Sequence, residues 1–182
     1  MKKLVARVIA LLLTIAVNSN FALAAPKDKA QRPSPPGKAA CKLPDGKTIT
    51  VDYSSPRMKG RKIFGDLVPF GKVWRAGANE ATSLVTDTAL AIDGKSIPAG
   101  SYTLFVIPNA DKWTLIISRK TGEWGVPYPG EADDLARVEM KVSKLPSAVE
   151  NFLIAFDQTG GTCTIQLDWE TTRASTAISE KK

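Results

Sequence analysis

The sequence predicts an all-β protein built as a single antiparallel β-sandwich domain. Apolar and polar residues alternate with a period of two in several short segments, and turn signals recur roughly every 8–12 residues. No stretch longer than about ten residues keeps the apolar stripe of a helix. Alternation of this kind buries one face of a strand. Counting strands leaves a flattened β-barrel open as the alternative to the sandwich.

The expected strands follow from the pattern of each segment. Alternation predicts half-buried strands at 48–53, 138–142, 152–156 and 163–169. Continuous apolar runs predict strands covered on both faces at 102–107 and 113–117. Asp93-Gly94, placed between two short apolar segments, predicts a tight hairpin.

The N-terminus has the layout of a secretory signal peptide. Lys2, Lys3 and Arg7 accompany an apolar run at 8–17, and an Ala-x-Ala cleavage site ends at Ala24. We expect cleavage there, because the run is about half as long as the roughly 20 residues of a membrane-spanning helix. No later segment is long and apolar enough to span a membrane. The sequence therefore predicts a periplasmic or secreted protein with no transmembrane segment after cleavage.

Changes in composition along the sequence divide the chain into four parts. A segment rich in proline, lysine and small residues follows the cleavage site and has little to bury, which is typical of a disordered linker. The expected parts are a signal peptide at 1–24, a disordered linker at 25–40, the β-sandwich domain at 41–178 and a frayed tail at 179–182.

The two cysteines, Cys41 and Cys163, are expected to form a disulfide. An even pair in an exported protein is usually bridged, and Cys163 opens an alternating segment whose odd positions are apolar, so its thiol points with the core residues. Two buried free thiols are the alternative. A catalytic or metal-binding role is disfavoured, because neither residue has a cysteine or histidine nearby.

The absence of histidine excludes several kinds of site. The chain contains none, which excludes Ser-His-Asp and Cys-His nucleophile systems, histidine-ligated zinc and the two-histidine iron site. The glycines at 65–72 fail the spacing of a phosphate-binding loop. We therefore expect no metal and no cofactor.

The positive net charge does not call for a nucleic-acid partner. The formal net charge is +7, and loss of the signal peptide with Lys2, Lys3 and Arg7 lowers it by three. Much of the net positive charge is therefore carried by the signal peptide, and we expect no nucleic-acid binding.

A long glycine-rich loop at 68–82 supplies the leading candidate site. Trp74, Arg75, Asn79 and Glu80 lie in it, so a cation, an amide and a carboxylate fall close together on a flexible backbone. They could clamp a small polar ligand, or Glu80 could act as a general base beside Arg75. The structural alternative has Trp74 plugging one end of the sandwich, Arg75 pairing with Glu80, and Asn79 capping a turn.

A basic run and an aromatic segment are further candidates. Arg57, Lys59 and Arg61 could bind an anionic ligand, although a charge run is usually a solvated turn. Trp124 and Tyr128, in a proline-stiffened segment, could stack on a sugar, although such residues more often cover a sheet edge.

Several blocks resemble a bacterial family known as domain-of-unknown-function 2911. They are 53–65 (YSSPRMKGRKIFG), 67–82 (LVPFGKVWRAGANEAT), 97–105 (IPAGSYTLF) and Trp169-Glu170. The resemblance spans about 48–178. It implies an exported, β-rich bacterial protein with no established activity, and it assigns no residue a role.

These observations favour a non-catalytic exported protein that binds a small polar or anionic ligand, a glycan or another envelope component. One alternative is a histidine-free enzyme that uses Glu80 with Arg75 and Asn79. The other is a structural protein that interacts with the envelope through a flat apolar surface.

Overall fold

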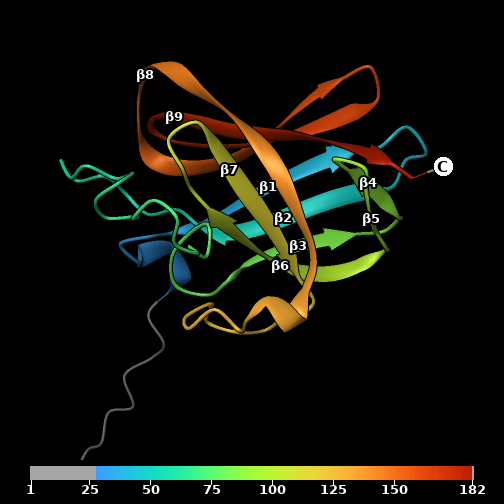
Figure 1. Ribbon diagram of the computed structural model, residues 1–182, viewed down its shortest axis with the longest axis horizontal. Coiled ribbons are helices and arrows are strands. Elements are labelled where there is room, and N and C mark those ends of the chain that lie inside the picture. The colour runs from blue at the N-terminus through green and yellow to red at the C-terminus, as the bar shows by residue number, and fades with distance from the viewer. Residues whose placement is uncertain (1–27, 182) are drawn as a thin grey trace, which may run out of the picture.

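The computed structural model describes residues 28–181. These residues form nine strands and two short 3₁₀ helices (Figure 1). The elements are η1 (Lys29–Gln31), β1 (Pro36–Lys42), β2 (Thr48–Ser54), β3 (Thr82–Thr86), β4 (Leu90–Ile92), β5 (Lys95–Ile97), β6 (Gly100–Ile107), β7 (Lys112–Ser118), η2 (Glu131–Asp133), β8 (Asp134–Thr159) and β9 (Thr162–Glu180). The prediction of an all-β protein is confirmed. The signal peptide predicted for 1–24 lies outside the described residues.

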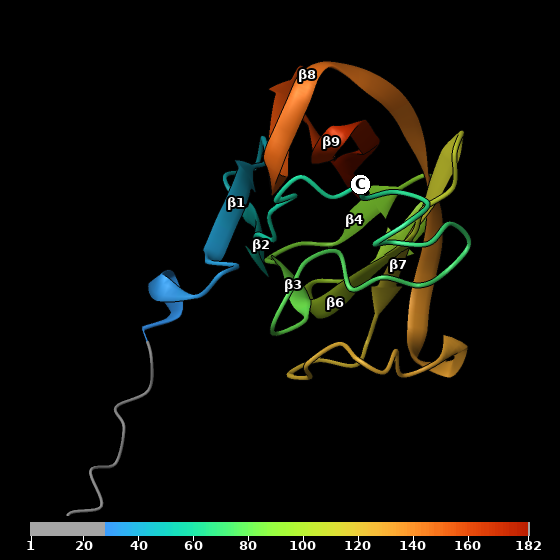
Figure 2. The ribbon, with the colours of Figure 1, turned by 90° about the vertical axis from the view of Figure 1, so that its left-hand side faces the viewer.

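One continuous antiparallel sheet supplies both layers of the fold. Its strand order is β1-β2-β3-β6-β7-β8-β9-β4-β5, and every pairing in it is antiparallel. The first part of β8 pairs with β7 and the rest with β9. Figure 2 shows β8 rising beside β7, arching over the top and descending near β1. The sheet thus folds over on itself as a sandwich, and its two end strands, β1 and β5, do not join to close a barrel.

The arch of β8 has a local cause. The ladder between β8 and β9 shifts register twice, between Lys144 and Val149 and between Val149 and Leu153. Pro146 lies in this interval and has no N–H to donate, so it breaks the ladder where the strand must bend. The predicted strands at 138–142 and 152–156 are therefore two halves of one strand, separated by a mostly exposed arch.

The core lies between the layers and follows the predicted alternation. On β9, Cys163, Ile165 and Leu167 are buried, as are Val138 and Met140 on β8. Five aromatic side chains pack at one end of this core through edge and stacked contacts: Phe64, Trp74, Trp113, Phe152 and Trp169. Burying one face of each strand in this way is the main stabilising contribution to such a fold.

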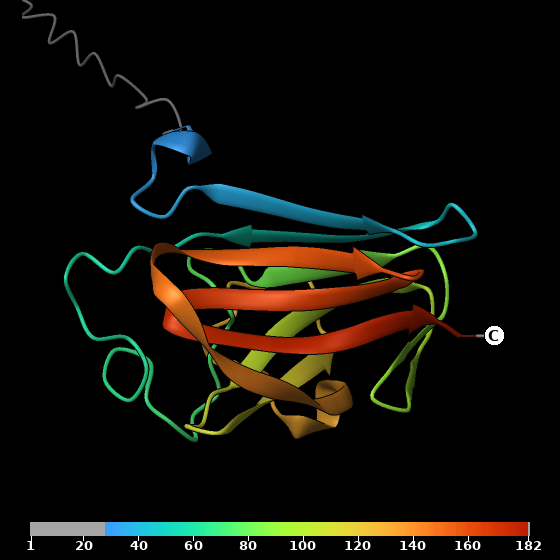
Figure 3. The same ribbon diagram turned by 90° about the horizontal axis from the view of Figure 1, so that it is seen from above.

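The predicted Cys41–Cys163 disulfide is confirmed. It joins β1 to the start of β9, and its two residues are 122 positions apart in the chain. Figure 3 shows β1 running alongside the second half of β8, to which it has no ladder. The disulfide therefore fastens an end strand of the sheet to the opposite layer.

The ordered domain begins before Cys41. Strand β1 starts at Pro36, inside the segment expected to be a disordered linker, and pairs with β2 along its whole length. Gly37 lies so close to the ring of Tyr53 that a Cβ would approach Tyr53 Cζ to 2.6 Å. The small residues of β1 fit against larger neighbours on β2. Because such residues have little apolar surface of their own, their composition suggested a linker.

The C-terminal end is also ordered beyond the predicted boundary. Strand β9 continues to Glu180, and its last residues pair with β4. The backbone N–H of Lys181 donates to the carbonyl of Ala89 over 2.8 Å. The hairpin predicted at Asp93-Gly94 is confirmed, with both residues at positive φ between β4 and β5. Within residues 28–181, no helix is long and apolar enough to cross a membrane.

Candidate functional site

The glycine-rich loop after β2 is tied down at both ends. Trp74 and Val106 of β6 exchange two backbone hydrogen bonds of 2.8 Å, and the N–H of Gly71 donates to Pro108 over 2.9 Å. Gly77 has a φ of +158°, and a Cβ there would lie 2.9 Å from Thr82 Oγ1 and 3.0 Å from the Ser54 carbonyl oxygen. The loop is therefore a packed structure in which Gly77 allows the close approach to β2.

Trp74 belongs to the aromatic end of the core. Its ring stacks on Trp169 with centroids 5.6 Å apart and meets Phe152 edge-on at 4.9 Å. This placement agrees with the structural role considered for Trp74. We therefore do not assign this side chain to ligand contact.

Arg75 and Glu80 do not pair with each other. Arg75 Nη1 donates to the carbonyl of Trp124 over 3.2 Å, and burial lowers the pKa of its guanidinium. The backbone between the two residues turns through positive φ at Ala76, Gly77 and Asn79. These turns direct the two side chains to different neighbours.

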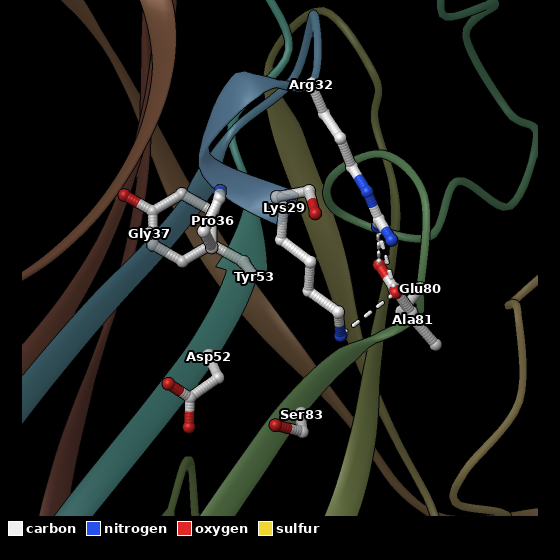
Figure 4. A pocket seen from close by; sticks show the side chains of 10 residues that line it. Lys29, Arg32, Pro36, Gly37, Asp52, Tyr53, Glu80, Ala81 and Ser83 are labelled. Atoms are coloured by element: carbon white, nitrogen blue, oxygen red, sulfur yellow. Dashed lines mark hydrogen bonds and ion pairs between the residues drawn. The ribbon is translucent and has the colours of Figure 1, made fainter. Parts of the chain in front are cut away.

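Asn79 and Glu80 instead hold the N-terminal arm, which we define as residues 28–35. Asn79 Nδ2 donates to the Ser34 carbonyl over 2.9 Å. Arg32 Nη1 donates to both carboxylate oxygens of Glu80 at 2.9 Å, and Lys29 Nζ lies 3.2 Å from Oε1 (Figure 4). The arm is thus attached to the loop by side chains from both segments.

These contacts also set the charge of Glu80. A hydrogen bond from its own backbone, followed by those from Arg32 and Lys29, lowers the pKa of Glu80 to about 2. A carboxylate with so low a pKa is a weak base at neutral pH. The geometry therefore favours Glu80 as an anchor over Glu80 as a general base.

Replacing Glu80 with glutamine is expected to loosen the arm. The Glu80 side chain is 40 % exposed, so we expect the free energy of unfolding to fall by about 1 kcal/mol or less at pH 7. The folded-state pKa lies below the ordinary value of 4.5. The contribution is therefore present above pH 4.5 and lost as the pH falls toward 2.

Urea unfolding of Glu80→Gln and wild type across this pH range measures the effect. Glu139→Gln, which removes an exposed carboxylate paired with one lysine, is the control. A stability difference between Glu80→Gln and wild type that stays constant down to pH 2 would contradict the assignment.

A cavity of about 210 Å³, with both apolar and polar lining, lies where the arm meets the sheet. It is formed by the arm, the start of β1, β2 and the residues leading into β3 (Figure 4). Its lining residues are Lys29, Arg32, Pro36, Gly37, Asp52, Tyr53, Ser54, Glu80, Ala81 and Ser83.

The cavity presents charges of both signs. Lys29 and Arg32 come from the arm, whereas Asp52 comes from β2 and pairs with the exposed Lys38 at 3.2 Å. Ser83 adds a hydroxyl from β3. The Tyr53 hydroxyl donates to the Ile154 carbonyl at 3.4 Å, and burial raises its pKa, so it stays protonated at neutral pH.

Arg57, at the start of the basic run, borders a different hollow, which Lys59 and Arg61 do not line. Arg57 donates to the side chain of Asn151 and borders a space of about 450 Å³ between the start of β1 and β8. The backbone N–H of Lys59 donates to Glu150 Oε1 at 2.9 Å. Arg61 folds back to the carbonyls of Met58 and Arg57.

The polar loop and the basic run therefore do not share one cavity. Glu80 lines the first space and Arg57 the second. The two spaces have Pro36, Gly37 and Tyr53 in common, so these residues form a partition between them.

The two residues of the aromatic segment face different ways. The Trp124 side chain is 54 % exposed. The Tyr128 ring packs edge-on against Phe105 with centroids 5.1 Å apart, and its hydroxyl donates to Asp134 Oδ1 over 2.6 Å. Trp124 is thus exposed, whereas Tyr128 is partly buried.

Sequence reasoning found Glu80 but missed most residues around it. Lys29 and Arg32 lie in the segment expected to be disordered, and Asp52 and Ser83 alternate with core residues on their strands. Alternation shows that Asp52 points away from the core, but not that the arm lies over that face. Among the described residues, no group of three or more aspartate, glutamate or cysteine side chains is placed to hold a metal ion.

The fold and the cavity define the class of this protein. It is an all-β antiparallel sandwich with a small, mixed-charge cavity covered by an N-terminal arm. The chain belongs to the DUF2911 family, described as proteins of unknown function, whose model matches residues 34–178. This match confirms the resemblance seen in the sequence. Comparisons with curated proteins and with solved structures found no match.

Proposed function

We propose that the protein is exported and binds a small polar ligand in the cavity beneath the N-terminal arm. The observation that carries this proposal is the cavity of about 210 Å³, in which Lys29, Arg32, Asp52 and Ser83 converge from three separate segments. Convergent polar groups in a concave site are the usual mark of a ligand pocket.

The size and charge of the cavity define the ligand class. Its volume is below the roughly 300–1,000 Å³ of pockets for drug-sized molecules, which favours a small metabolite. An anionic group would compete with the Glu80 carboxylate for Lys29 and Arg32, and hydrogen-bond donors would face Asp52 and Ser83. The Tyr53 ring, Pro36 and Gly37 supply an apolar wall.

Export is supported by two independent features. The first 24 residues have the layout of a signal peptide, and the mature chain carries the Cys41–Cys163 disulfide. Disulfides persist in oxidising compartments and are rare in the cytosol. A periplasmic or secreted location fits both.

Filling the cavity is expected to weaken ligand binding. A thermal-shift screen of anionic, zwitterionic and neutral polar metabolites should yield a ligand that raises Tm by about 5–10 °C at 100 times its Kd. Ser83→Leu places a larger apolar side chain in the cavity wall, and we expect its affinity for that ligand to be at least about tenfold weaker.

Val85→Leu is the matched control, because Val85 is exposed and lies two positions further along the same strand. It should bind as wild type does. The proposal fails if no compound in the three classes raises Tm, or if Ser83→Leu retains wild-type affinity.

A further inference from the structure

The segment between β7 and η2 exposes an indole ring. The Trp124 side chain is 54 % exposed and the neighbouring Val126 is 64 % exposed. Trp113 and Trp169 are each 1 % exposed, and Trp74 packs into the aromatic end of the core. Among the described tryptophans, Trp124 is thus the most exposed to solvent.

The backbone around this ring is held in place. Arg75 Nη1 donates to the Trp124 carbonyl over 3.2 Å, and the N–H of Ala81 donates to the Glu123 carbonyl over 3.1 Å. A Cβ at Gly125 would lie 3.0 Å from Ala81 Cβ and 3.1 Å from Arg75 Cβ. The segment therefore packs closely on the glycine-rich loop, and the backbone that carries the exposed ring is held in place, which lowers the entropic cost of binding.

Polar groups surround the ring in a shallow hollow. The hollow measures about 430 Å³ and is separate from the cavity beneath the arm. The lining residues that matter here are Lys120, Glu123, Trp124, Val126, Pro129 and Asp133. Lys120 and Glu123 lie 3.8 Å apart at their charged atoms, and within residues 28–181 no side chain or backbone group pairs with the Asp133 carboxylate.

This combination fits the chemistry of a saccharide. The C–H face of a pyranose ring is apolar and can lie against an aromatic face, whereas its hydroxyl groups donate to carboxylates at the ring's edge. Two carboxylates and one ammonium give the hollow a net negative charge, which disfavours acidic sugars. The Tyr128 ring packs against Phe105, so the sugar ring would stack on Trp124.

We propose that this hollow is a binding site for neutral saccharides, with Trp124 as the stacking platform and Glu123 and Asp133 as hydroxyl acceptors. The site stands independently of the ligand proposed for the cavity beneath the arm, since the two share no lining residue. It would let an exported protein attach to a glycan while the cavity stays accessible.

A saccharide array followed by titration tests the proposal. The array presents neutral and N-acetylated mono- to tetrasaccharides together with uronic and sulfated ones. We expect the wild-type protein to bind at least one neutral saccharide, with a blue shift of tryptophan emission as the exposed indole is covered. Trp124→Ala should weaken binding of that saccharide about tenfold or more.

Phe70→Ala is the matched control, because it removes a 44 % exposed aromatic ring from another loop. It should bind the same saccharide within about twofold of wild type, while Glu123→Gln and Asp133→Asn each bind more weakly. Three outcomes overturn the proposal: no neutral saccharide binds at about 10 mM, Trp124→Ala binds as wild type does, or only acidic saccharides bind. Unchanged Tm values for the variants show that each is folded.

Discussion

Replacing Trp169 with alanine is expected to lower the free energy of unfolding by about 3–5 kcal/mol. The Trp169 side chain is 1 % exposed, and its ring stacks on Trp74 at 5.6 Å and meets Phe152 at 5.7 Å. Its Nε1 donates to the Glu150 carbonyl over 3.2 Å, so truncation also leaves that acceptor without its partner. The loss is large relative to the roughly 5–15 kcal/mol of a typical domain.

Urea unfolding monitored by circular dichroism measures this loss. Trp124→Ala is the control, because it deletes the same side chain at an exposed position and should change the free energy of unfolding by less than about 0.5 kcal/mol. Equal losses in the two variants would show that the aromatic end of the core is not packed as described. The contrast also separates the structural tryptophan from the one proposed to bind saccharides.

Removing the Cys41–Cys163 disulfide is expected to destabilise the fold by about 2–5 kcal/mol. The bond spans 122 residues, and in the chain-entropy model a loop of this length restricts the unfolded chain strongly. For a domain of this size, such a loss lowers Tm by roughly 10 °C. The double variant Cys41→Ala/Cys163→Ala avoids a free thiol and is the variant to compare with wild type.

The disulfide also has a local effect that hydrogen exchange can detect. Strand β1 pairs with β2 on one side, and the disulfide fastens it to the opposite layer. We expect amides of β1 to exchange faster in the double variant, while amides of β6 and β7 change less. Reducing agent should lower the Tm of wild type and leave that of the double variant unchanged. A double variant as stable as wild type would contradict this role.

Much of the fold could be predicted because its signals are local. Alternation around Cys163, Ile165 and Leu167 reflects the geometry of a single strand, and Asp93-Gly94 sets its own turn. The half-strands of β8 were also recognised, although not their continuity. That continuity depends on an exposed arch, where alternation has no meaning because neither face meets the core.

Strand β1 shows where local reasoning failed. Gly37, Ala39 and Ala40 have little apolar surface of their own, so the segment resembles a linker. In the folded protein these small residues fit against β2, and Gly37 admits the ring of Tyr53. The strand exists because of what lies beside it, and that information is not in its own sequence.

The candidate site, too, could be predicted only where its signals are local. The loop and its Glu80 could be singled out from residue types, but Glu80 binds Arg32, 48 positions earlier, and does not bind Arg75, five positions earlier. Positive φ at Ala76 and Asn79 turns the neighbouring side chains apart. Closeness in sequence was therefore a poor guide to the ion pairs of this loop.

The sequence by itself determined the all-β class, most strands, the family resemblance and the pairing of Cys41 with Cys163. These depend on periodicity, on composition and on there being just two cysteines. Only the tertiary structure decided that the sheet folds over at β8, that the N-terminal arm borders one cavity with Asp52 and Ser83, and that Trp124 faces solvent while Trp169 does not. Each of these outcomes depends on which distant segment packs against a residue, and local sequence patterns do not specify that packing.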